Sequence, residues 1–202
     1  MLSGQGITFR YGADKPWILR DVTLEVAPGE VVGLSGPSGL GKTTLAKILA
    51  GYLSPNAGSV TVGSQPLPAR GYCPVQLIFQ HPELAVNPRW RIRQVLGEAH
   101  FPLAELMAAL SLDVSWLERW PHELSGGELQ RVAVARALGP QTRYLIADEM
   151  TAMLDANTQA QIWQAVQAQV RQHNLGLLVI SHETPLLRRL CQRIVSMAEL
   201  AG

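Results

Sequence analysis

The feature that most constrains this chain is a glycine-rich segment that stands between an apolar run of strand length and a helical pattern. Residues 36–43 read Gly-Pro-Ser-Gly-Leu-Gly-Lys-Thr and fit the pattern G-x-x-x-x-G-K-[ST]. Residues 30–35, which precede it, have the composition of a buried strand. The glycines let the backbone bend so that successive N–H groups face one anion, and the following helix adds the positive end of its dipole. The sequence therefore predicts a strand–loop–helix unit that cradles the phosphates of a nucleoside triphosphate.

Each residue type in this loop has an expected task. Lys42 can reach the β and γ phosphates, the hydroxyl of Thr43 suits Mg²⁺, and Thr44 can donate to the α phosphate. The backbone of the cradle is expected to come from Gly36, Ser38, Gly39 and Gly41. The helix after the loop is predicted from the apolar stripe at Leu45, Ile48, Leu49 and Tyr52. We expect it to end at residues 54–56, which read Ser-Pro-Asn.

Two acidic residues follow a second apolar run. The run Tyr144–Ala147 predicts a buried strand that leads directly into Asp148 and Glu149. Asp148 is placed to hold Mg²⁺ and its water shell, and Glu149 to orient or deprotonate an attacking water. An Asp-Glu pair alone is most often a solvated helix start. Its position at the end of an apolar strand, downstream of the phosphate loop, favours the functional interpretation.

The order of the remaining patterns predicts an α/β fold. Residues 75–79, 144–147 and 175–180 are short apolar runs, typical of parallel strands covered on both faces. Residues 7–9 and 22–26 alternate with period two, as expected of an antiparallel edge sheet, and residues 194–197 are a last strand candidate. Residues 82–138 are mostly helical in pattern and are predicted to form a helical lobe inserted in the α/β core. With 202 residues, we expect one domain over 1–202.

Composition excludes several classes of protein. Apolar residues make up 47% and charged residues 16% of the chain, and its net charge is +1, which argues against disorder and against a polyanion-binding surface. No window holds 18 uninterrupted apolar residues and the start lacks the pattern of a signal peptide, so we expect neither a membrane span nor secretion. Cys73 and Cys191 lie far apart, which favours reduced thiols over a disulfide framework or a zinc site.

A second glycine-containing motif narrows the choice among proteins with a phosphate loop. Residues 124–130 read Leu-Ser-Gly-Gly-Glu-Leu-Gln before a helical pattern. A serine and two glycines before a helix offer a hydroxyl, N–H groups and a dipole to a phosphate, so Ser125, Gly126 and Gly127 are a second candidate anion site. The alternative is a plain helix cap. The heptapeptide resembles the signature of ATP-binding-cassette (ABC) ATPases.

Four further positions resemble motifs of that family and appear in its order along the chain. Tyr11 resembles the aromatic residue that stacks on adenine, and Gln80 the glutamine that senses Mg²⁺ and the γ phosphate and touches the membrane subunit. Asp155, in Met-Leu-Asp, resembles the end of the loop that crosses between two cassettes. His182 resembles the histidine that contacts the γ phosphate. Without the resemblance, Tyr11 would equally suit an ordinary edge strand and His182 a turn or cap.

Two positions and one segment characterise this chain within the family. The family usually has proline after the catalytic glutamate, where this chain has Met150, and a small residue before Leu-Asp, where it has Met153. Neither change removes a ligand, but the rigidity of this loop is put in question. Residues 79–89, which contain Asn-Pro-Arg, look like the glutamine-loop region of ATPases that serve peptide and nickel importers.

The resemblance implies a P-loop ABC ATPase core that binds ATP and Mg²⁺ and hydrolyses ATP between two head-to-tail subunits, identical or paralogous. Each nucleotide would lie between the phosphate loop of one subunit and the signature of the other. Permease subunits and an extracytoplasmic solute-binding protein are the further partners implied, with the chain on the inner face of the cell membrane and no nucleic acid bound. The output would be import of peptides or nickel.

Two alternatives were weighed against this interpretation. The first is a non-transport ABC-type ATPase that acts on nucleic acid or the ribosome; the near-neutral charge, the single cassette and the lack of a long heptad insertion argue against it. The second is a small-molecule phosphotransferase with a phosphate loop. That chemistry gives no task to the loop at Ser125–Gly127.

Overall fold

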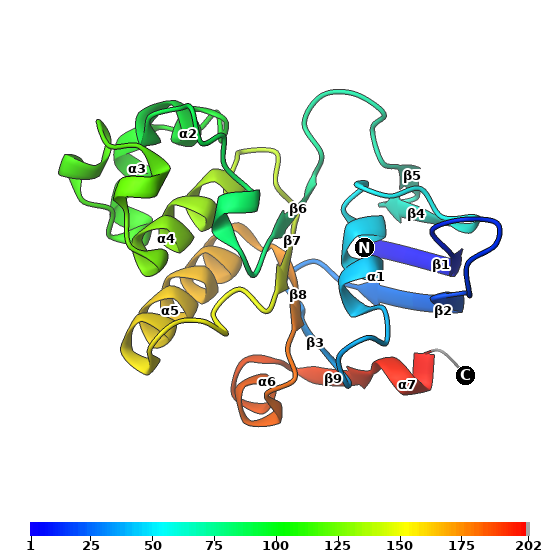
Figure 1. Cartoon of the computed structure of the whole chain (residues 1–202). Coiled ribbons are helices and arrows are strands. Elements are labelled where there is room, and N and C mark those ends of the chain that lie inside the picture. Colours follow the sequence, from blue (N-terminus) through cyan, green and yellow to red (C-terminus); the bar gives the residue numbers. More distant parts are fainter. Residues whose placement is uncertain (201–202) are drawn as a thin grey trace.

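The computed structural model describes residues 1–200 and contains two sheets (Figure 1). One is a five-stranded parallel sheet in the order β6-β7-β8-β3-β9, and the other is a four-stranded antiparallel sheet in the order β2-β1-β4-β5. The strands are β1 Leu2–Phe9, β2 Leu19–Val26, β3 Val31–Ser35, β4 Ala57–Val62, β5 Gln65–Pro66, β6 Val75–Ile78, β7 Tyr144–Asp148, β8 Gly176–Ile180 and β9 Arg193–Ser196. The predicted parallel core and antiparallel edge sheet are confirmed.

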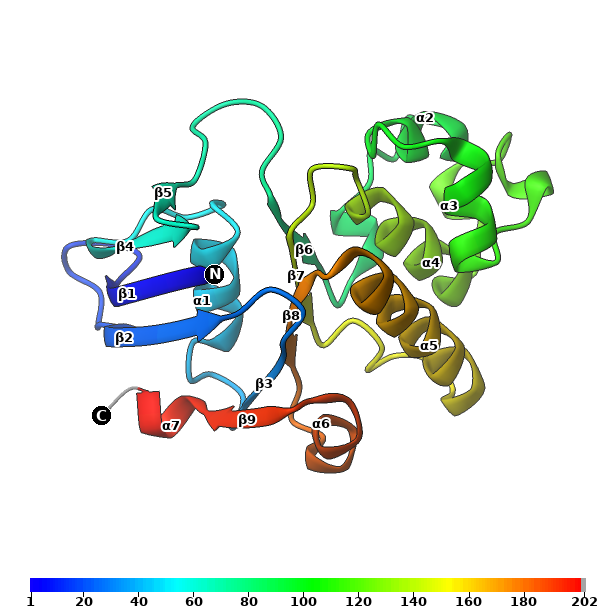
Figure 2. The same ribbon diagram turned by 180° about the vertical axis from the view of Figure 1, so that it is seen from behind.

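Helices cover both faces of the parallel sheet. They are α1 Lys42–Leu49, α2 Ile92–Gly97, α3 Leu103–Leu110, α4 Gly126–Ala137, α5 Ala156–His173, α6 Thr184–Leu190 and α7 Met197–Leu200, with 3-10 turns η1 Pro82–Leu84, η2 Val114–Trp116 and η3 Pro121–Glu123. Figures 1 and 2 show α4 and α5 on one side of the sheet and α1 with the antiparallel sheet on the other. β7 and β8 are buried along their whole length, and their sequences are accordingly almost continuous apolar runs.

Side chains of one strand therefore belong to two hydrophobic clusters. In β8, Leu177 and Val179 pack with α4 and α5, whereas Leu178 and Ile180 pack with α1 and the antiparallel sheet. This alternation follows from the two-residue period of a strand. Because β3, β7 and β8 are parallel, the loops at their C-terminal ends lie at one edge of the sheet.

The first helix ends earlier than the sequence pattern predicts. We expected it to run to residues 54–56, with Tyr52 on its apolar stripe, but α1 ends at Leu49 and Tyr52 is 54% exposed. Gly51 has φ +78°, and Tyr52 N–H donates to Lys47 O while Gly51 N–H donates to Ile48 O. These two bonds form a Schellman motif, which a glycine stabilises because it adopts the left-handed conformation without strain.

Two strands were missed by the sequence analysis. β4 pairs with β1, and the short β5 pairs with β4, both antiparallel. The pairing brings β4 so close to β1 that a Cβ at Gly58 would lie 2.4 Å from the carbonyl oxygens of Gln5 and Gly6. β4 is exposed to half-buried along its length, so its sequence lacks the alternation that marks a strand with one buried face.

The segment between β6 and β7 contains helices and 3-10 turns and, within the described residues 1–200, no strand. α2 and α3 both pack on α4, and α4 contacts α5. The boundaries of the inserted lobe at 82 and 138, and a single domain over 1–202, stay predictions.

Among the described residues, none of the helices combines the length and the apolar character needed to cross a bilayer.

Candidate functional site

The phosphate loop lies at the C-terminal end of β3 and leads into α1. Gly36, Gly39 and Gly41 all have positive φ, at +145°, +86° and +89°. At Gly41 a side chain is also excluded by space, because a Cβ there would lie 2.8 Å from a methyl group of Ile18. These conformations favour glycine, and they bend the loop as a phosphate cradle requires. The predicted strand–loop–helix unit is present.

Lys42 lies inside this loop. Its side chain is buried, with the residue 6% exposed, and its ammonium donates to the carbonyl oxygens of Gly36 at 2.7 Å and Pro37 at 2.9 Å. The N-cap of α1 is Gly41, which offers no side-chain acceptor to the first N–H groups of the helix. The loop therefore combines a fixed ammonium, free backbone donors and a helix dipole, which is the donor set that a polyphosphate requires.

Tyr11 lies beside the first turn of α1. Its hydroxyl is 3.4 Å from Thr44 Oγ1, and its ring packs edge-on against Phe9 with the centroids 5.0 Å apart. The residue is 59% exposed, so a ring face is accessible next to the phosphate loop. Ser38 is exposed on the loop itself. The roles of Tyr11 in adenine stacking and of Ser38 and Thr44 in phosphate binding stay predictions.

Asp148 is the last residue of β7 and is 5% exposed. Burial raises the pKa of its carboxyl group above the ordinary value, and the neighbouring Glu149 raises it further. A hydrogen bond from Thr43 and the charge of Lys42 act in the opposite direction. A buried carboxylate paired with a hydroxyl is an all-oxygen donor set, which fits Mg²⁺, and a dication would offset the cost of keeping Asp148 charged.

This raised pKa predicts a pH dependence for metal binding. Because Asp148 takes up a proton at a higher pH than an ordinary aspartate, protons compete with Mg²⁺ earlier as the solution is acidified. We expect the Mg²⁺ affinity of the ATP-bound protein to fall as pH decreases through this raised pKa. Asp148→Asn should weaken Mg²⁺ binding and remove that part of the pH dependence. Calorimetric Mg²⁺ titrations from neutral to mildly acidic pH measure both; an unchanged pH profile in the variant would contradict the assignment.

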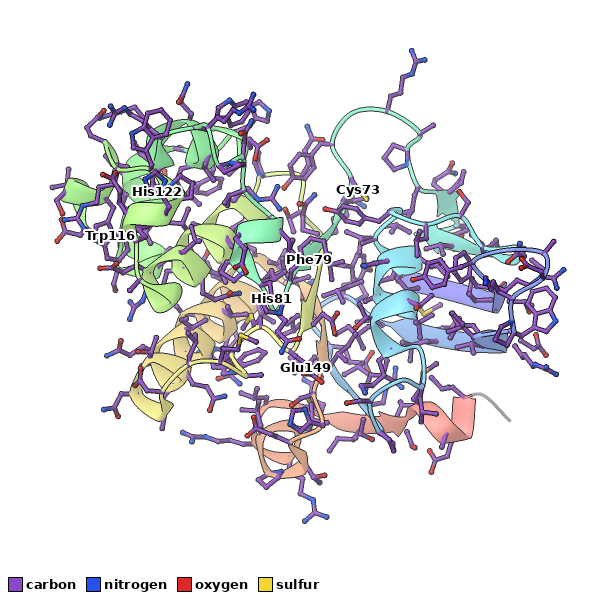
Figure 3. All side chains as sticks on the ribbon, viewed as in Figure 1. Cys73, Phe79, His81, Trp116, His122 and Glu149 are labelled. Atoms are coloured by element: carbon purple, nitrogen blue, oxygen red, sulfur yellow. The ribbon has the colours of Figure 1, made fainter. Side chains whose placement is uncertain are left out.

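Glu149 and His182 meet at the same edge of the sheet. Glu149 directly follows β7, and Oε1 of its carboxylate is 3.2 Å from His182 Nδ1, which lies just beyond β8. The N–H of Glu149 donates to Ile180 O at 3.0 Å. Figure 3 places Glu149 in the middle of the molecule, below the ends of β6 and β7. A carboxylate aligned by an imidazole, one residue from the magnesium candidate, is suited to orient a water molecule.

Gln80 lies at this edge as well. It follows β6, whose register pairs Ile78 with Ala147, so Gln80 stands next to the end of β7. The residue before it is held by a contact that the sequence analysis missed: Gln130 Nε2 in α4 donates to Phe79 O at 3.3 Å. Gln130 is 1% exposed. A glutamine among the apolar positions of a helix is the sequence feature that could have indicated a buried hydrogen bond here.

The signature loop, Ser125–Gly127, lies at the start of α4 and not beside the phosphate loop. Ser125 is the N-cap of α4: its Oγ accepts from Glu128 N–H at 3.4 Å, and its N–H donates to the Glu128 carboxylate at 2.7 Å. The helix cap that the sequence left open as an alternative is thus present. Gly127 also has a packing reason, since a Cβ there would lie 2.9 Å from Thr158 Cγ2 in α5. The exposed Gly126 has none, as nothing lies within 4 Å of a Cβ built on it.

Asp155 begins α5 beside this loop. Its carboxylate accepts from the N–H groups of Asn157 and Thr158 and from the Thr158 hydroxyl, and these bonds lower its pKa. Figures 1 and 2 show α4 and α5 on the face of the sheet opposite to α1. The structure therefore groups the predicted residues into two sets. Those of the phosphate-loop edge are Tyr11, Gly36–Thr44, Gln80, Asp148, Glu149 and His182, and those of the second set are Ser125, Gly126, Gly127 and Asp155.

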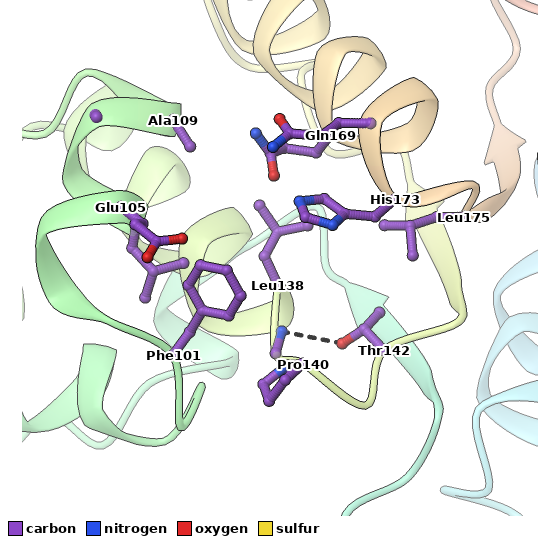
Figure 4. A pocket seen from close by; sticks show the side chains of 13 residues that line it. Phe101, Glu105, Ala109, Leu138, Pro140, Thr142, Gln169, His173 and Leu175 are labelled. Carbon is purple, nitrogen blue, oxygen red and sulfur yellow. Dashed lines mark hydrogen bonds between the residues drawn. The ribbon is translucent and has the colours of Figure 1, made fainter.

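A cavity of about 510 Å³ lies between α3 and the C-terminal end of α5 (Figure 4). Phe101, Leu138, Leu175 and His173 are among its lining residues. It adjoins the segments that lead into β7 and β8, whereas the phosphate loop and the acidic pair lie at the C-terminal ends of the strands. This cavity is consequently separate from the phosphate-binding edge.

Comparison with known proteins agrees with this geometry. Residues 19–152 match the family described as ABC transporter. The chain is 36% identical over 199 residues to the nickel import ATP-binding protein NikE of Escherichia coli strain K12, which covers 89% of this chain and 74% of that protein. It is 35% identical, with the same coverage, to NikE of Shigella boydii.

Solved structures share the fold. The dimeric structure of the ABC transporter cassette MJ0796 superposes with a TM-score of 0.81 at 24% identity, over 97% of this chain and 94% of that one. CbiO1 from Clostridium perfringens, part of an ABC transporter complex, gives 0.79 at 21% identity, over 96% of this chain and 83% of that one. The matched motifs, the parallel sheet and these relatives lead to one conclusion. The chain belongs to the ABC transporter family and is an ATP-binding subunit with ATPase activity.

Proposed function

We propose that this chain hydrolyses ATP in a head-to-tail dimer and thereby drives a membrane permease. The proposal of a dimer rests on where the chain places its two candidate phosphate-binding loops. The loop at Gly36–Thr43 and the loop at Ser125–Gly127 precede helices on opposite faces of the parallel sheet (Figure 2). One nucleotide cannot contact both loops of the same chain in that arrangement. Two copies facing each other give each phosphate loop the signature loop of its partner.

The proposed roles of the residues follow from their contacts. Lys42 and the N–H groups of the glycine loop hold the β and γ phosphates. Thr43, Asp148 and Gln80 would hold Mg²⁺, which would neutralise charge on the phosphates. Glu149 orients the attacking water and accepts its proton, and His182 fixes the position of that carboxylate and faces the γ phosphate.

The transport part of the proposal is supported by the relatives, which are named nickel import ATP-binding proteins. We place the chain on the inner face of the cell membrane, with permease subunits bound in the region that follows Gln80, where the exposed Arg89 and the half-buried Trp90 lie. An extracytoplasmic solute-binding protein would deliver nickel or a peptide. Purification of the tagged chain from detergent-solubilised membranes, followed by identification of the bound subunits, distinguishes this from binding to ribosomes or nucleic acid.

The proposed nucleotide site, shared between the phosphate loop of one chain and the signature loop of its partner, has a direct test. Ser125→Arg places a bulky side chain at an exposed position where the γ phosphate of the opposite nucleotide would dock. We expect ATP binding to the monomer to change little, because Tyr11, Lys42 and Thr43 are untouched, whereas ATP-dependent dimerisation and turnover should fall together by roughly 100-fold. Equilibrium ATP binding, size-exclusion chromatography with Mg-ATP and steady-state hydrolysis measure the three quantities.

Mixing two variants sharpens this test. A heterodimer of Ser125→Arg and Lys42→Ala subunits places both lesions in one site and leaves the other site intact. Partial recovery of ATP-dependent dimerisation is therefore expected if the partner is an identical chain. If Ser125→Arg alone binds ATP poorly as a monomer, the signature loop serves its own nucleotide and the head-to-tail arrangement is wrong.

A further inference from the structure

The segment that carries Glu149 crosses from β7 to α5 and is anchored at three points; we call residues 149–155 the β7–α5 segment. Its first residue is held by Glu149 N–H donating to Ile180 O at 3.0 Å. Its last residue, Asp155, caps α5. Between them Thr151 is buried, at 2% exposed, and contacts side chains of α5. The segment is therefore fixed at both ends and in its middle.

The middle anchor consists of two hydrogen bonds to one hydroxyl. Thr151 Oγ1 accepts from Trp163 Nε1 at 3.1 Å and from Gln159 Nε2 at 3.0 Å. Trp163 is 5% exposed, and the space left between it and residues 149–152 is about 10 Å³. So small a space does not hold a group of water molecules that would replace these bonds. Loss of the Thr151 hydroxyl would leave the indole N–H of Trp163 buried without a partner.

Glu149 has a conformation that requires such anchoring. Its φ is +47°, in the left-handed region that residues other than glycine rarely adopt. A residue in this region stays there only when the surrounding structure holds the chain on both sides. The bond to Ile180 restrains the chain at Glu149, and Thr151 restrains it two residues later. Met150 between them is buried and lacks the fixed φ of a proline.

We propose that Thr151, bound by Trp163 and Gln159, is a positioning residue that holds the Glu149 carboxylate in its working orientation. The proposal rests on the proposed role of Glu149 in activating water. Side-chain hydrogen bonds connect residues 149–151 to α5. Thr151 is buried, with its hydroxyl bonded to side chains of α5, so the anchor is expected to act on the rate of hydrolysis and to leave ATP binding unchanged.

Two variants test the anchor. Thr151→Val removes the hydroxyl at nearly constant volume, and Trp163→Phe removes the indole N–H but keeps an aromatic ring. Each is expected to lower kcat by roughly 10-fold and to leave the KM for ATP unchanged. Trp116→Phe is the matched control: Trp116 packs against the same hydrophobic cluster but lies at the far edge of the helices, away from Glu149 (Figure 3). A lower melting temperature with unchanged kcat would overturn the proposal.

A double-mutant cycle separates positioning from general destabilisation. If Thr151 acts through Glu149, the residual turnover of Glu149→Gln is the same with and without Thr151→Val, as measured in single turnovers of radiolabelled ATP. A further 10-fold loss in the double variant would mean that Thr151 acts by another route, and the proposal would be wrong. Full activity of Glu149→Gln alone would instead overturn the role of Glu149, and the anchor with it.

Discussion

Replacing Glu149 by glutamine is expected to lower ATP turnover by roughly 1,000-fold while ATP still binds. In the unmodified protein, His182 Nδ1 lies 3.2 Å from the Glu149 carboxylate. The amide of glutamine keeps the size of the side chain and a hydrogen bond to His182, but it cannot accept a proton from water. Because the step that opens the dimer is lost, the variant should accumulate as a closed dimer with Mg-ATP. Steady-state hydrolysis and light scattering coupled to size exclusion measure the two effects.

Glu183→Gln is the matched control for this experiment. Glu183 is an exposed carboxylate one residue beyond His182, at the N-cap of α6, so its loss changes the charge of the region by the same amount. We expect its turnover to equal that of the wild type. A Glu149→Gln protein that stays strictly monomeric with Mg-ATP, or that hydrolyses ATP at the wild-type rate, would refute the assignment of Glu149.

Lys42→Ala is expected to weaken ATP binding by about 100-fold or more and to abolish hydrolysis, since charge-assisted hydrogen bonds are among the strongest single contacts in proteins. Lys42 is the only lysine in the loop, and its ammonium already lies within it, bonded to Gly36 O and Pro37 O. The fold should survive, because these two carbonyl groups lie at the edge of the protein and water can replace the ammonium.

Lys15→Ala controls for the loss of one positive charge. Lys15 is exposed and, among residues 1–200, forms an ion pair with Asp14 alone, at 3.9 Å, so we expect unchanged ATP affinity in that variant. Titration with a fluorescent ATP analogue compares the affinities, and far-UV circular dichroism checks the fold. Wild-type turnover in a folded Lys42→Ala protein would mean that residues 36–43 do not hold the nucleotide.

Local sequence patterns predicted those parts of the structure whose conformation depends on neighbouring residues. The phosphate loop was predicted correctly because the glycines at 36, 39 and 41 are needed for backbone conformations within the loop itself. The parallel strands were predicted because burial on two faces requires a continuous apolar run. The end of α1 also has a local cause, the Schellman motif at Gly51 with Ile48 and Lys47, but the predicted end at residues 54–56 was wrong.

Other properties of the site depend on segments far apart in the chain. Gln130 and Phe79 meet only because α4 packs against the end of β6, and the contact of Trp163 with Thr151 depends on how α5 lies along the segment that follows β7. No motif marks these pairs, because a glutamine or tryptophan on the buried face of a helix has the same local pattern whatever it contacts.

The sequence by itself determined the family motifs, the order of the parallel strands along the chain, and which residue types are available for phosphate, metal and water. The tertiary structure decided that burial raises the pKa of Asp148, that Glu149 lies in a left-handed conformation, and that the helices after the two predicted phosphate-binding loops lie on opposite faces of the sheet. The physical reason is that backbone conformations in a tight loop depend on adjacent residues. Burial, strain and the separation of two sites depend on packing between distant segments.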